Sequence, residues 1–432
     1  MEGAVAVDIV RDPLWNNIRV DARALRLIDT RTFQRLRYVR QLGWAYLVYP
    51  GATHTRFEHA LGAYHLAGIT LHLLEERGEL ADVAPEECAI VRAAALLHDV
   101  GHYPFSHALE EIGAPHHEDV ARPLITTGEI ATVLREIADD APERVFALIR
   151  GRSPSPLQGL VSGSLDLDKI EYLKRDAHMC GVPYGEIDAD RLINSLTVVL
   201  DPESGRPRIG VLEKGLSALE SLLFAKYQMY RNVYWHHAVR SATAMYKRLV
   251  EEALASGALT PAELPTLTDE SLLNTLERRA PSSLLDALRN RRLYKRSFEC
   301  PAAELAPEVG EWIATDRAGA VRVEDALAEE CGLRPGELLL DFPEKTQMLG
   351  LDIPVVRRTG TVRRLTSEGM AGAINLPQLS EQLYRSARWL RVFTTRPVDI
   401  PGARVLEVAR AGAAAVGGVP AVPGSTAPAH RD

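Results

Sequence analysis

Cysteine and aromatic residues are scarce in this sequence, and long apolar runs are absent. Four cysteines without CxxC spacing occur among 432 residues, so neither a zinc ribbon nor a disulfide framework is indicated. No run approaches the roughly 18 apolar residues of a transmembrane helix, and residues 1–10 lack the basic segment and apolar core of a secretion signal. We therefore expect a cytoplasmic protein with no membrane partner.

Basic residues are also too few to cover the surface. The formal net charge is -8, whereas the apolar share of 46% and the charged share of 25% are ordinary for a globular protein. This balance argues against a protein that binds nucleic acid over its whole surface. Basic residues at 289–296 could still form a local patch, although a solvated helix face or an intersubunit contact is the more common use of such a stretch. Nucleic acid is therefore an unexpected partner that stays open.

Helical periodicity dominates the chain, with apolar residues recurring every three or four positions. The pattern and its Pro and Gly punctuation predict helices at 57–76, from 85 to 98, and over 213–255. Alternation around a turn predicts a strand pair at 195–200 and 208–211.

The domain organisation follows from these elements. Short mixed segments such as 353–356 and 389–393 are typical of a smaller α+β unit, and the last residues are rich in Ala, Gly, Val and Pro. We predict a mainly α protein with a helical core over 1–300, an α+β C-terminal lobe over 301–410 and a flexible tail over 411–432.

Histidine is concentrated in one part of the chain. Nine of 13 histidines fall between His54 and His117. An apolar helix is predicted to end at His98 and Asp99, and Gly101 permits the turn that would aim both side chains at one point. Imidazole and carboxylate together suit Fe, Mn or Zn. Taken alone, the dipeptide is equally consistent with a helix end that has a solvated aspartate and a capping histidine.

The flanks of these residues carry a more specific pattern. His59 precedes the pair, Asp168 follows it, and residues 98–107 read HDVGHYPFSH. The chain resembles the deoxynucleoside triphosphate triphosphohydrolases of the HD superfamily from near Asp12 to about Arg296, with a weaker continuation to near Val398. The segments that carry the resemblance are 33–43, 49–62, 98–107, 168–176 and 230–237.

The resemblance implies an HD-domain helical core, a metal site and a reaction. A divalent transition metal (Fe, Mn or Zn) would be held by His59, His98, Asp99 and Asp168, and additional Mg or Mn could bind with the triphosphate. A metal-activated water would attack the α-phosphorus and release deoxynucleoside and inorganic triphosphate. Among the catalytic residues that the family implies, Asp168 would hold the metal, and His102, His107 and His117 would surround the α-phosphate. His107 or His117 would protonate the leaving 5′ oxygen.

Substrate contacts are implied in the same way. Arg56, Lys169 and Tyr172 match positions that contact the triphosphate, and charge-assisted bonds from the two cations fit a ligand of about four negative charges. Gln41 and Asp176 match positions that bind the 3′-hydroxyl, while the Tyr172 ring would leave no room for a 2′-hydroxyl. The remaining positions expected to bind substrate are Leu42, Lys226, Tyr234 and Trp235.

Several positions depart from the family pattern. Lys226 stands where an arginine is common, so the charge remains without the bidentate fork, and Trp235 replaces a glutamine that contacts the base. Asp29 and Arg37 match a guanine-nucleotide activator pocket, but Asp8 stands where that pocket has a lysine. The family implies a homo-oligomer, dimer or tetramer, and the nucleotide activator stays open.

Two other functions remain open. One keeps the metal site but changes the substrate to another nucleotide or phosphoester, such as an NTP, an alarmone or a monophosphate. The other is an assembly protein that binds nucleic acid and uses the pocket only to sense nucleotides.

Overall fold

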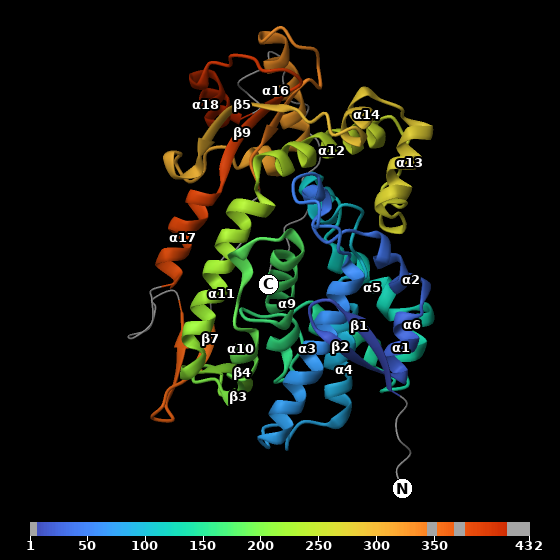
Figure 1. The fold of residues 1–432 in the computed structure, drawn as a ribbon, viewed down its shortest axis with the longest axis vertical. Coiled ribbons are helices and arrows are strands. Elements are labelled where there is room, and N and C mark those ends of the chain that lie inside the picture. The colour runs from blue at the N-terminus through green and yellow to red at the C-terminus, as the bar shows by residue number, and fades with distance from the viewer. Residues whose placement is uncertain (1–6, 344–351, 367–375, 413–432) are drawn as a thin grey trace.

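The computed structural model describes residues 7–343, 352–366 and 376–412, and these residues are mainly helical, as predicted (Figure 1). The central helices lie in the middle and lower part of the view, and a small three-stranded sheet with its covering helices lies at the top. Most of the predicted tail, from 413 onward, lies outside the described residues.

Two helices that were expected from the sequence form the base of the site. Helix α3 (Arg56–Glu76) begins with a capping box in which the Glu58 side chain accepts from the Thr55 backbone N–H. Helix α4 (Pro85–Leu97) has its proline in the first turn, where no hydrogen-bond donor is needed. The predicted helices at 57–76 and 85–98 are therefore confirmed to within a residue.

Helix α9 (Leu167–Cys180) packs against α3 and completes the base of the site. The Asp166 side chain accepts from Lys169 N at 3.0 Å and starts the helix, whereas Gly181 ends it in the left-handed conformation at φ 67°. Asp168 is thereby fixed in the first turn.

Shorter helices surround this base. They are α1 (Ala22–Ile28), α2 (Arg31–Gln34), α5 (His117–Thr126), α6 (Gly128–Leu134), α7 (Ala141–Ile149), α8 (Gln158–Val161), α10 (Ala189–Ile193), α13 (Asp269–Arg279) and α14 (Ser283–Arg289). Short 3₁₀ turns are η1 (Arg35–Tyr38), η2 (Gly43–Leu47), η3 (Ser106–Ile112), η4 (Pro183–Gly185), η5 (Glu213–Gly215), η7 (Leu264–Thr266) and η8 (Ala302–Glu304).

The long helix predicted over 213–255 is wrong, because the structure breaks it. Helix α11 (Leu216–Met229) passes into a π-helical turn (Tyr230–Tyr234), and α12 (His237–Ala255) starts anew. The His236 ring accepts from Ala238 N at 3.2 Å and so caps α12. Helical periodicity continues through this region, so the pattern alone did not reveal the break. A π turn often marks a functional site.

Three sheets complete the fold of the described residues. Strands β1 (Val7–Asp12) and β2 (Asn16–Asp21) form a hairpin. The predicted strand pair is confirmed as antiparallel β3 (Leu196–Leu200) and β4 (Pro207–Leu212), with Val198 opposite Ile209. The third sheet has the order β5-β9-β6, formed by β5 (Lys295–Pro301), β9 (Trp389–Thr394) and β6 (Leu338–Asp341).

The segment that follows residue 300 is divided between two of these sheets. Strand β7 (Ile353–Val356) runs parallel to β4, with Val211 opposite Val355, and β8 (Val362–Leu365) pairs with β7. Helix α17 (Leu376–Ala387) packs against α11, while α15 (Trp312–Thr315), α16 (Arg317–Glu330) and α18 (Gly402–Ala411) lie near the three-stranded sheet. The predicted domain limits at 300 and 410 stay predictions.

Apolar side chains gather in several buried clusters. The largest joins α3, α4, α9, α11 and the four-stranded sheet, a second lies beneath α12 to α14, and a third lies between the three-stranded sheet, α16 and α18. None of the described helices is long and apolar enough to cross a membrane.

Candidate active site

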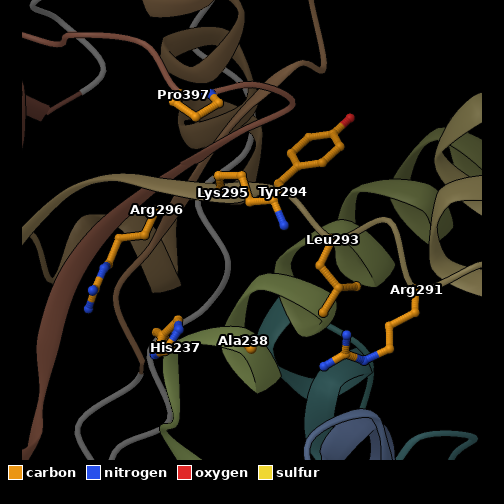
Figure 2. Close-up of a pocket in the computed structure, with 8 residues that line it drawn as sticks. All are labelled: His237, Ala238, Arg291, Leu293, Tyr294, Lys295, Arg296 and Pro397. Atoms are coloured by element: carbon orange, nitrogen blue, oxygen red, sulfur yellow. The ribbon is translucent and has the colours of Figure 1, made fainter.

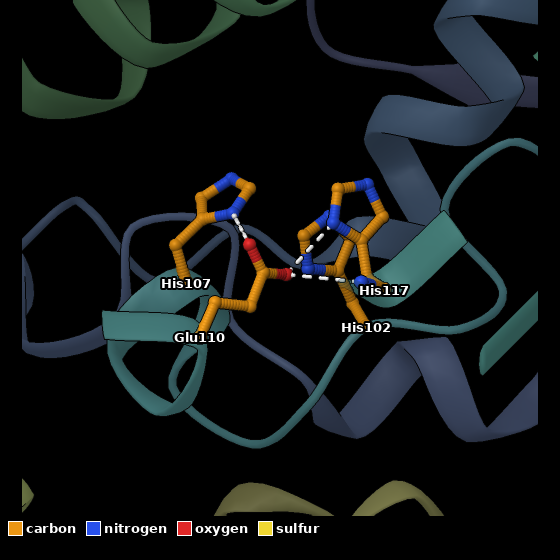
Figure 3. A group of neighbouring side chains, drawn as sticks. All are labelled: His102, His107, Glu110 and His117. Carbon is orange, nitrogen blue, oxygen red and sulfur yellow. Dashed lines mark hydrogen bonds and ion pairs between the residues drawn. The ribbon is translucent and has the colours of Figure 1, made fainter. Parts of the chain in front are cut away.

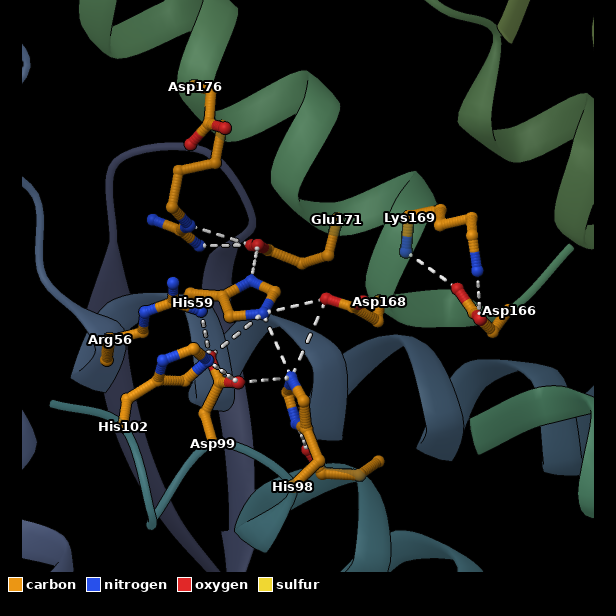
Figure 4. A network of polar contacts seen from close by, with 12 residues as sticks. Arg56, His59, His98, Asp99, His102, Asp166, Asp168, Lys169, Glu171 and Asp176 are labelled. Atoms are coloured by element: carbon orange, nitrogen blue, oxygen red, sulfur yellow. Dashed lines mark hydrogen bonds and ion pairs between the residues drawn. The ribbon is translucent and has the colours of Figure 1, made fainter. Parts of the chain in front are cut away.

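The predicted metal ligands converge where α3, α4 and α9 meet (Figure 4). His59 lies in the first turn of α3, His98 and Asp99 follow α4, and Asp168 lies in the first turn of α9. His59 Nε2 is 3.0 Å from Asp168 Oδ1, 3.1 Å from His98 Nε2 and 3.6 Å from Asp99 Oδ2. The structure thus brings together four residues that are up to 109 positions apart.

Hydrogen bonds at the far side of each imidazole set its tautomer. His59 Nδ1–H donates to Glu171 Oε2 at 2.6 Å, and His98 Nδ1–H donates to the Ala95 carbonyl at 2.9 Å. Each ring then keeps its lone pair on Nε2, and the two Nε2 atoms face one another at 3.1 Å. Two lone pairs at that distance repel, so the arrangement calls for a cation between them.

The spacing of the donors also fits a metal ion. Bonds of about 2.1 Å place neighbouring ligands about 3.0 Å apart in octahedral geometry and about 3.4 Å apart in tetrahedral geometry. The two Nε2 atoms are 3.1 Å apart, and each lies 3.0 to 3.6 Å from the nearest oxygens of Asp99 and Asp168. His59, His98 and Asp168 offer ligand atoms that all lie within 4.8 Å of one another, whereas Asp99 lies outside that group and also contacts Arg56 and His102. Two imidazole nitrogens with two carboxylates suit a divalent transition metal such as Fe, Mn or Zn.

The electrostatics of the centre favour positive charge. Although burial lowers it, hydrogen bonds to Asp168 and Glu171 raise the pKa of His59 to about 10. Burial raises the pKa of Asp168, but His59 and His98 outweigh it and hold that pKa well below its usual value. A group of anionic carboxylates around two imidazoles stabilises whichever cation occupies the space, a proton or a metal ion.

Glu171 is a functional residue that the sequence reasoning missed. It is fully buried and accepts from Arg175 Nε at 2.7 Å as well as from His59. Gly62 makes the contact possible, because a Cβ at that position would lie 2.0 Å from Glu171 Oε1. The available clue was spacing, since Glu171 lies one helical turn after Asp168.

A second cluster contains His102, His107, Glu110 and His117 (Figure 3). Glu110 bridges two of the rings, accepting from His117 Nδ1–H at 2.8 Å and from His107 Nδ1–H at 3.2 Å. The rings of His102 and His117 stack with centroids 3.7 Å apart. The three histidines predicted from the sequence are therefore brought together, and Glu110 is an addition that its i+3 spacing from His107 could have indicated.

His102 connects the two clusters. Its Nε2–H donates to Asp99 Oδ1 at 3.1 Å, which leaves the lone pair on Nδ1. Burial and the nearby Arg56 guanidinium lower the pKa of His102 well below its ordinary value, so the ring is neutral at pH 7. Within the described residues Nδ1 is buried and has no hydrogen-bond partner. It is thus an acceptor available to a bound ligand or water.

The backbone that carries this second cluster is strained. Phe105 and Ser106 both have positive φ angles, 57° and 66°, which are uncommon for residues with side chains. Asp269 holds the turn by accepting from Phe105 N at 2.8 Å. Gly101 is needed for close packing, because a Cβ there would lie 2.0 Å from the His117 carbonyl.

In the described part of the chain, Arg56 contacts a metal ligand directly, and the charge of Asp168 acts on both Lys169 and Lys226. Arg56 donates to Asp99 Oδ2 at 2.7 Å and also bonds the Ser106 hydroxyl. Lys169 pairs with Asp166 and donates to the Gly163 carbonyl. Lys226 is buried, and burial together with the charge of Lys169 lowers its pKa to about 8.

Two of the predicted sugar-binding residues, Gln41 and Asp176, both contact His54, whereas Tyr172 lies near His59. Asp176 accepts from Tyr234 Oη at 2.7 Å and contacts His54 Nε2 at 2.7 Å. Gln41 N donates to the His54 carbonyl at 3.0 Å, and Gln41 Oε1 is buried with no partner within the described part of the chain. The Tyr172 ring lies 6.5 Å from the His59 ring, between centroids.

Other predicted contacts differ in exposure. Leu42 is half-buried and packs against the main core. Trp235 is almost completely buried, with its ring centroid 4.9 Å from Tyr230 and 5.9 Å from Tyr384. Trp235 therefore packs into the core where a glutamine would offer polar groups to a base.

The predicted activator residues lie on the surface. Asp29 follows α1 and is exposed, and Arg37 lies over the Phe57 ring at 3.5 Å while its Nε donates to Gln34. Asp8 is exposed on β1.

The basic stretch at 289–296 lines a separate pocket of about 380 Å³ (Figure 2). Part of its charge is paired, since Arg289 meets Glu270 at 3.4 Å and Arg296 meets Glu299 at 2.6 Å. The pocket is lined by His237, Ala238, Arg291, Leu293, Tyr294, Lys295, Arg296 and Pro397. None of these residues was predicted to bind substrate.

Two family models match the chain. Residues 56–160 match the HD domain, and residues 187–373 match the HD-associated region. The first match contains His59, His98 and Asp99, whereas Asp168 lies just beyond it.

Individual relatives extend the likeness. The uncharacterised protein MJ1154 of Methanocaldococcus jannaschii is 35% identical over 327 residues, which cover 75% of this chain and 67% of that protein. The deoxynucleoside triphosphate triphosphohydrolase SAMHD1 homolog of Dictyostelium discoideum is 30% identical over 312 residues, 66% of this chain and 59% of that protein.

A solved structure shows the same fold. A phosphohydrolase from Bacteroides thetaiotaomicron (BT4208) superposes with a TM-score of 0.70 at 23% sequence identity. The match covers 90% of this chain and 100% of that chain. The predicted mainly α fold with an HD helical core is confirmed.

Proposed function

This chain belongs to the HD-domain phosphohydrolases that carry the HD-associated region, and we propose that it hydrolyses deoxynucleoside triphosphates to deoxynucleoside and inorganic triphosphate. The observation that carries the proposal is the set of cations beside the metal ligands, formed by Arg56, Lys169 and Lys226. Three cations match a triphosphate better than a monophosphate. The name of the Dictyostelium relative supports the same substrate.

The metal ligands would bind the cation that activates the phosphate. His59, His98, Asp99 and Asp168 would bind a divalent cation, with further Mg or Mn entering alongside the triphosphate. Such a cation supplies charge neutralisation at the phosphoryl oxygens and makes a nearby water more acidic. Glu171 keeps the His59 lone pair directed at that point.

The histidine cluster is proposed to move protons. Glu110 accepts from Nδ1–H of both His107 and His117, which leaves the Nε2 atom of each ring to exchange a proton with the leaving 5′ oxygen. Burial lowers the pKa of His117, which makes its protonated form a stronger acid. We propose a different role for neutral His102, that of a proton acceptor, because its Nδ1 lone pair can accept a hydrogen bond from the attacking water.

Sugar recognition is proposed further along the same face of α9, because Asp168, Tyr172 and Asp176 follow one another at four-residue spacing. The buried Gln41 Oε1 can accept from a 3′-hydroxyl, since it has no partner in the described structure. Asp176 already accepts from Tyr234 and would share that network with the sugar. Tyr172 would exclude the 2′-hydroxyl by its bulk, and Leu42 and Trp235 would border the nucleoside.

The partners are proposals that rest on the resemblance. We propose assembly as a homo-oligomer, a dimer or a tetramer, with a nucleotide activator at Asp29 and Arg37. Asp8 on β1 would repel the phosphate of such an activator, so we expect weak activation. Gel filtration with and without GTP, followed by rate measurements, tests both points.

The substrate test uses the purified protein with Mn²⁺. Each dNTP and NTP is supplied singly and in mixtures, and products are separated by anion exchange. Deoxynucleoside plus inorganic triphosphate supports the proposal. Monophosphate plus pyrophosphate, or turnover of NTPs alone, would contradict it and favour the alternative of another nucleotide or phosphoester.

A further inference from the structure

A buried ion-pair network lies between the histidine cluster and the three-stranded sheet. Arg240 on α12 donates through Nη1 and Nη2 to the two oxygens of Glu111 at 3.0 and 2.9 Å. Its Nε and Nη2 also donate to Asp341 on β6 at 3.1 and 2.6 Å. Lys247, two helical turns further along α12, donates to Glu111 Oε2 at 2.9 Å. These two carboxylates and two cationic side chains therefore form a group with no net charge.

Stability alone does not explain why this ion-pair network is buried. Arg240 is 5% exposed and Asp341 is fully buried. Removing charges from water offsets much of the attraction between them, so an apolar replacement can be as stable as a buried ion pair. The bidentate geometry instead fixes the relative positions of the segments that it joins.

One of those segments carries the proposed proton donors. Glu111 follows Glu110 in η3, and Glu110 holds His107 and His117. The backbone at the start of η3 is strained, because Phe105 and Ser106 both have positive φ angles.

We propose that Arg240 is a positioning residue for catalysis, which acts through Glu111 to hold η3 in register against α12 and β6. The inference rests on the proposed function. The C-terminal sheet, although remote in sequence, thereby sets the place of the Glu110 carboxylate. Helix α12 makes a second contact just before η3, where Tyr246 Oη donates to the Pro104 carbonyl at 3.2 Å.

The test compares two charge-balanced double variants. Arg240→Met with Asp341→Asn removes the link, leaves Glu111 paired with Lys247 and leaves the neighbouring Arg391 with Glu299 as its acidic partner. Arg248→Met with Glu324→Gln is the control, because this pair also joins α12 to the C-terminal part, at 3.3 Å, without reaching η3. Both proteins are checked by thermal melting and circular dichroism.

We expect the first variant to lose kcat about 10- to 100-fold with little change in KM, since a misplacement near 1 Å has that effect. The control should keep kcat within about twofold at a similar melting temperature. Equal kcat values in the two variants would overturn the inference. If the first variant fails to fold, Arg240→Lys keeps the charge but loses the fork, and a wild-type kcat in that variant would be equally decisive.

Hydrogen exchange separates this inference from the proposed function. Amides of residues 106–112 should exchange faster in the first variant than in the control, whether or not any nucleotide is hydrolysed. An inactive wild-type protein with this exchange pattern would remove the proposed function and leave the structural role of Arg240 standing. Unchanged exchange at 106–112 would contradict the inference even in an active enzyme.

Discussion

The two histidine clusters contain similar residues but have opposite electrostatic arrangements. In the metal cluster, His59 and His98 both turn Nε2 lone pairs toward one point, and carboxylates surround that point. In the second cluster, Glu110 lies behind His107 and His117, and their Nε2 atoms are left for other partners. Glu171 lies behind His59 in the same way, so the clusters differ in the carboxylates of Asp99 and Asp168 on the Nε2 side. We propose that this difference separates a site that binds a cation from one that transfers protons.

The largest effect is expected from a substitution that removes one of the metal ligands. Asp168→Ala removes a ligand that contacts both His59 and His98, so we expect loss of bound metal and a fall in activity of about 1,000-fold or more, from several kcal/mol of lost stabilisation. Metal analysis of the purified variant and its turnover rate check this. Full metal content with normal activity would show that the cluster has been assigned wrongly.

The next effect concerns the second cluster. His107→Gln and His117→Gln should each lower kcat by about 100-fold or more while metal content stays at the wild-type level, because proton transfer rather than metal binding is lost. His72→Gln is the control, since His72 is an exposed residue of α3. A loss of metal in either active-site variant would erase the distinction between the clusters.

Glu171→Gln should have an intermediate effect. The amide can no longer act as a charged acceptor for His59, so metal affinity should fall about 10- to 100-fold. Metal titration followed by calorimetry measures this. Glu58→Gln, which alters only the capping box of α3, serves as the comparison and should change stability rather than metal affinity.

The smallest effect is expected from the pH dependence of KM, which tests whether Lys226 binds the phosphates. Burial and the charge of Lys169 lower the pKa of Lys226 to about 8, so its charge is present below that pH and is lost as the pH rises through it. KM for the triphosphate should therefore rise by up to about tenfold between pH 7 and pH 9. Lys226→Arg should flatten this dependence because arginine keeps its charge. An unchanged slope would place Lys226 away from the phosphates.

The sequence predicted the ends of α3 and α4 well because local chemistry sets them. A capping box and a first-turn proline act within a few residues, as at Thr55 and Pro85. The break between α11 and α12 was missed because its π turn keeps nearly helical periodicity. Pairing of β7 with β4 was also missed, since it joins residues more than 140 positions apart.

The sequence by itself determined the ligand types, their order along the chain and the likeness to the HD phosphohydrolases. Only the tertiary structure decided which groups support them, namely Glu171 behind His59, Glu110 between two histidines, and Arg240 beneath Glu111. The reason is physical. A ligand is recognised by its own chemistry, whereas the tautomer of an imidazole and the place of a strained turn depend on contacts between distant segments.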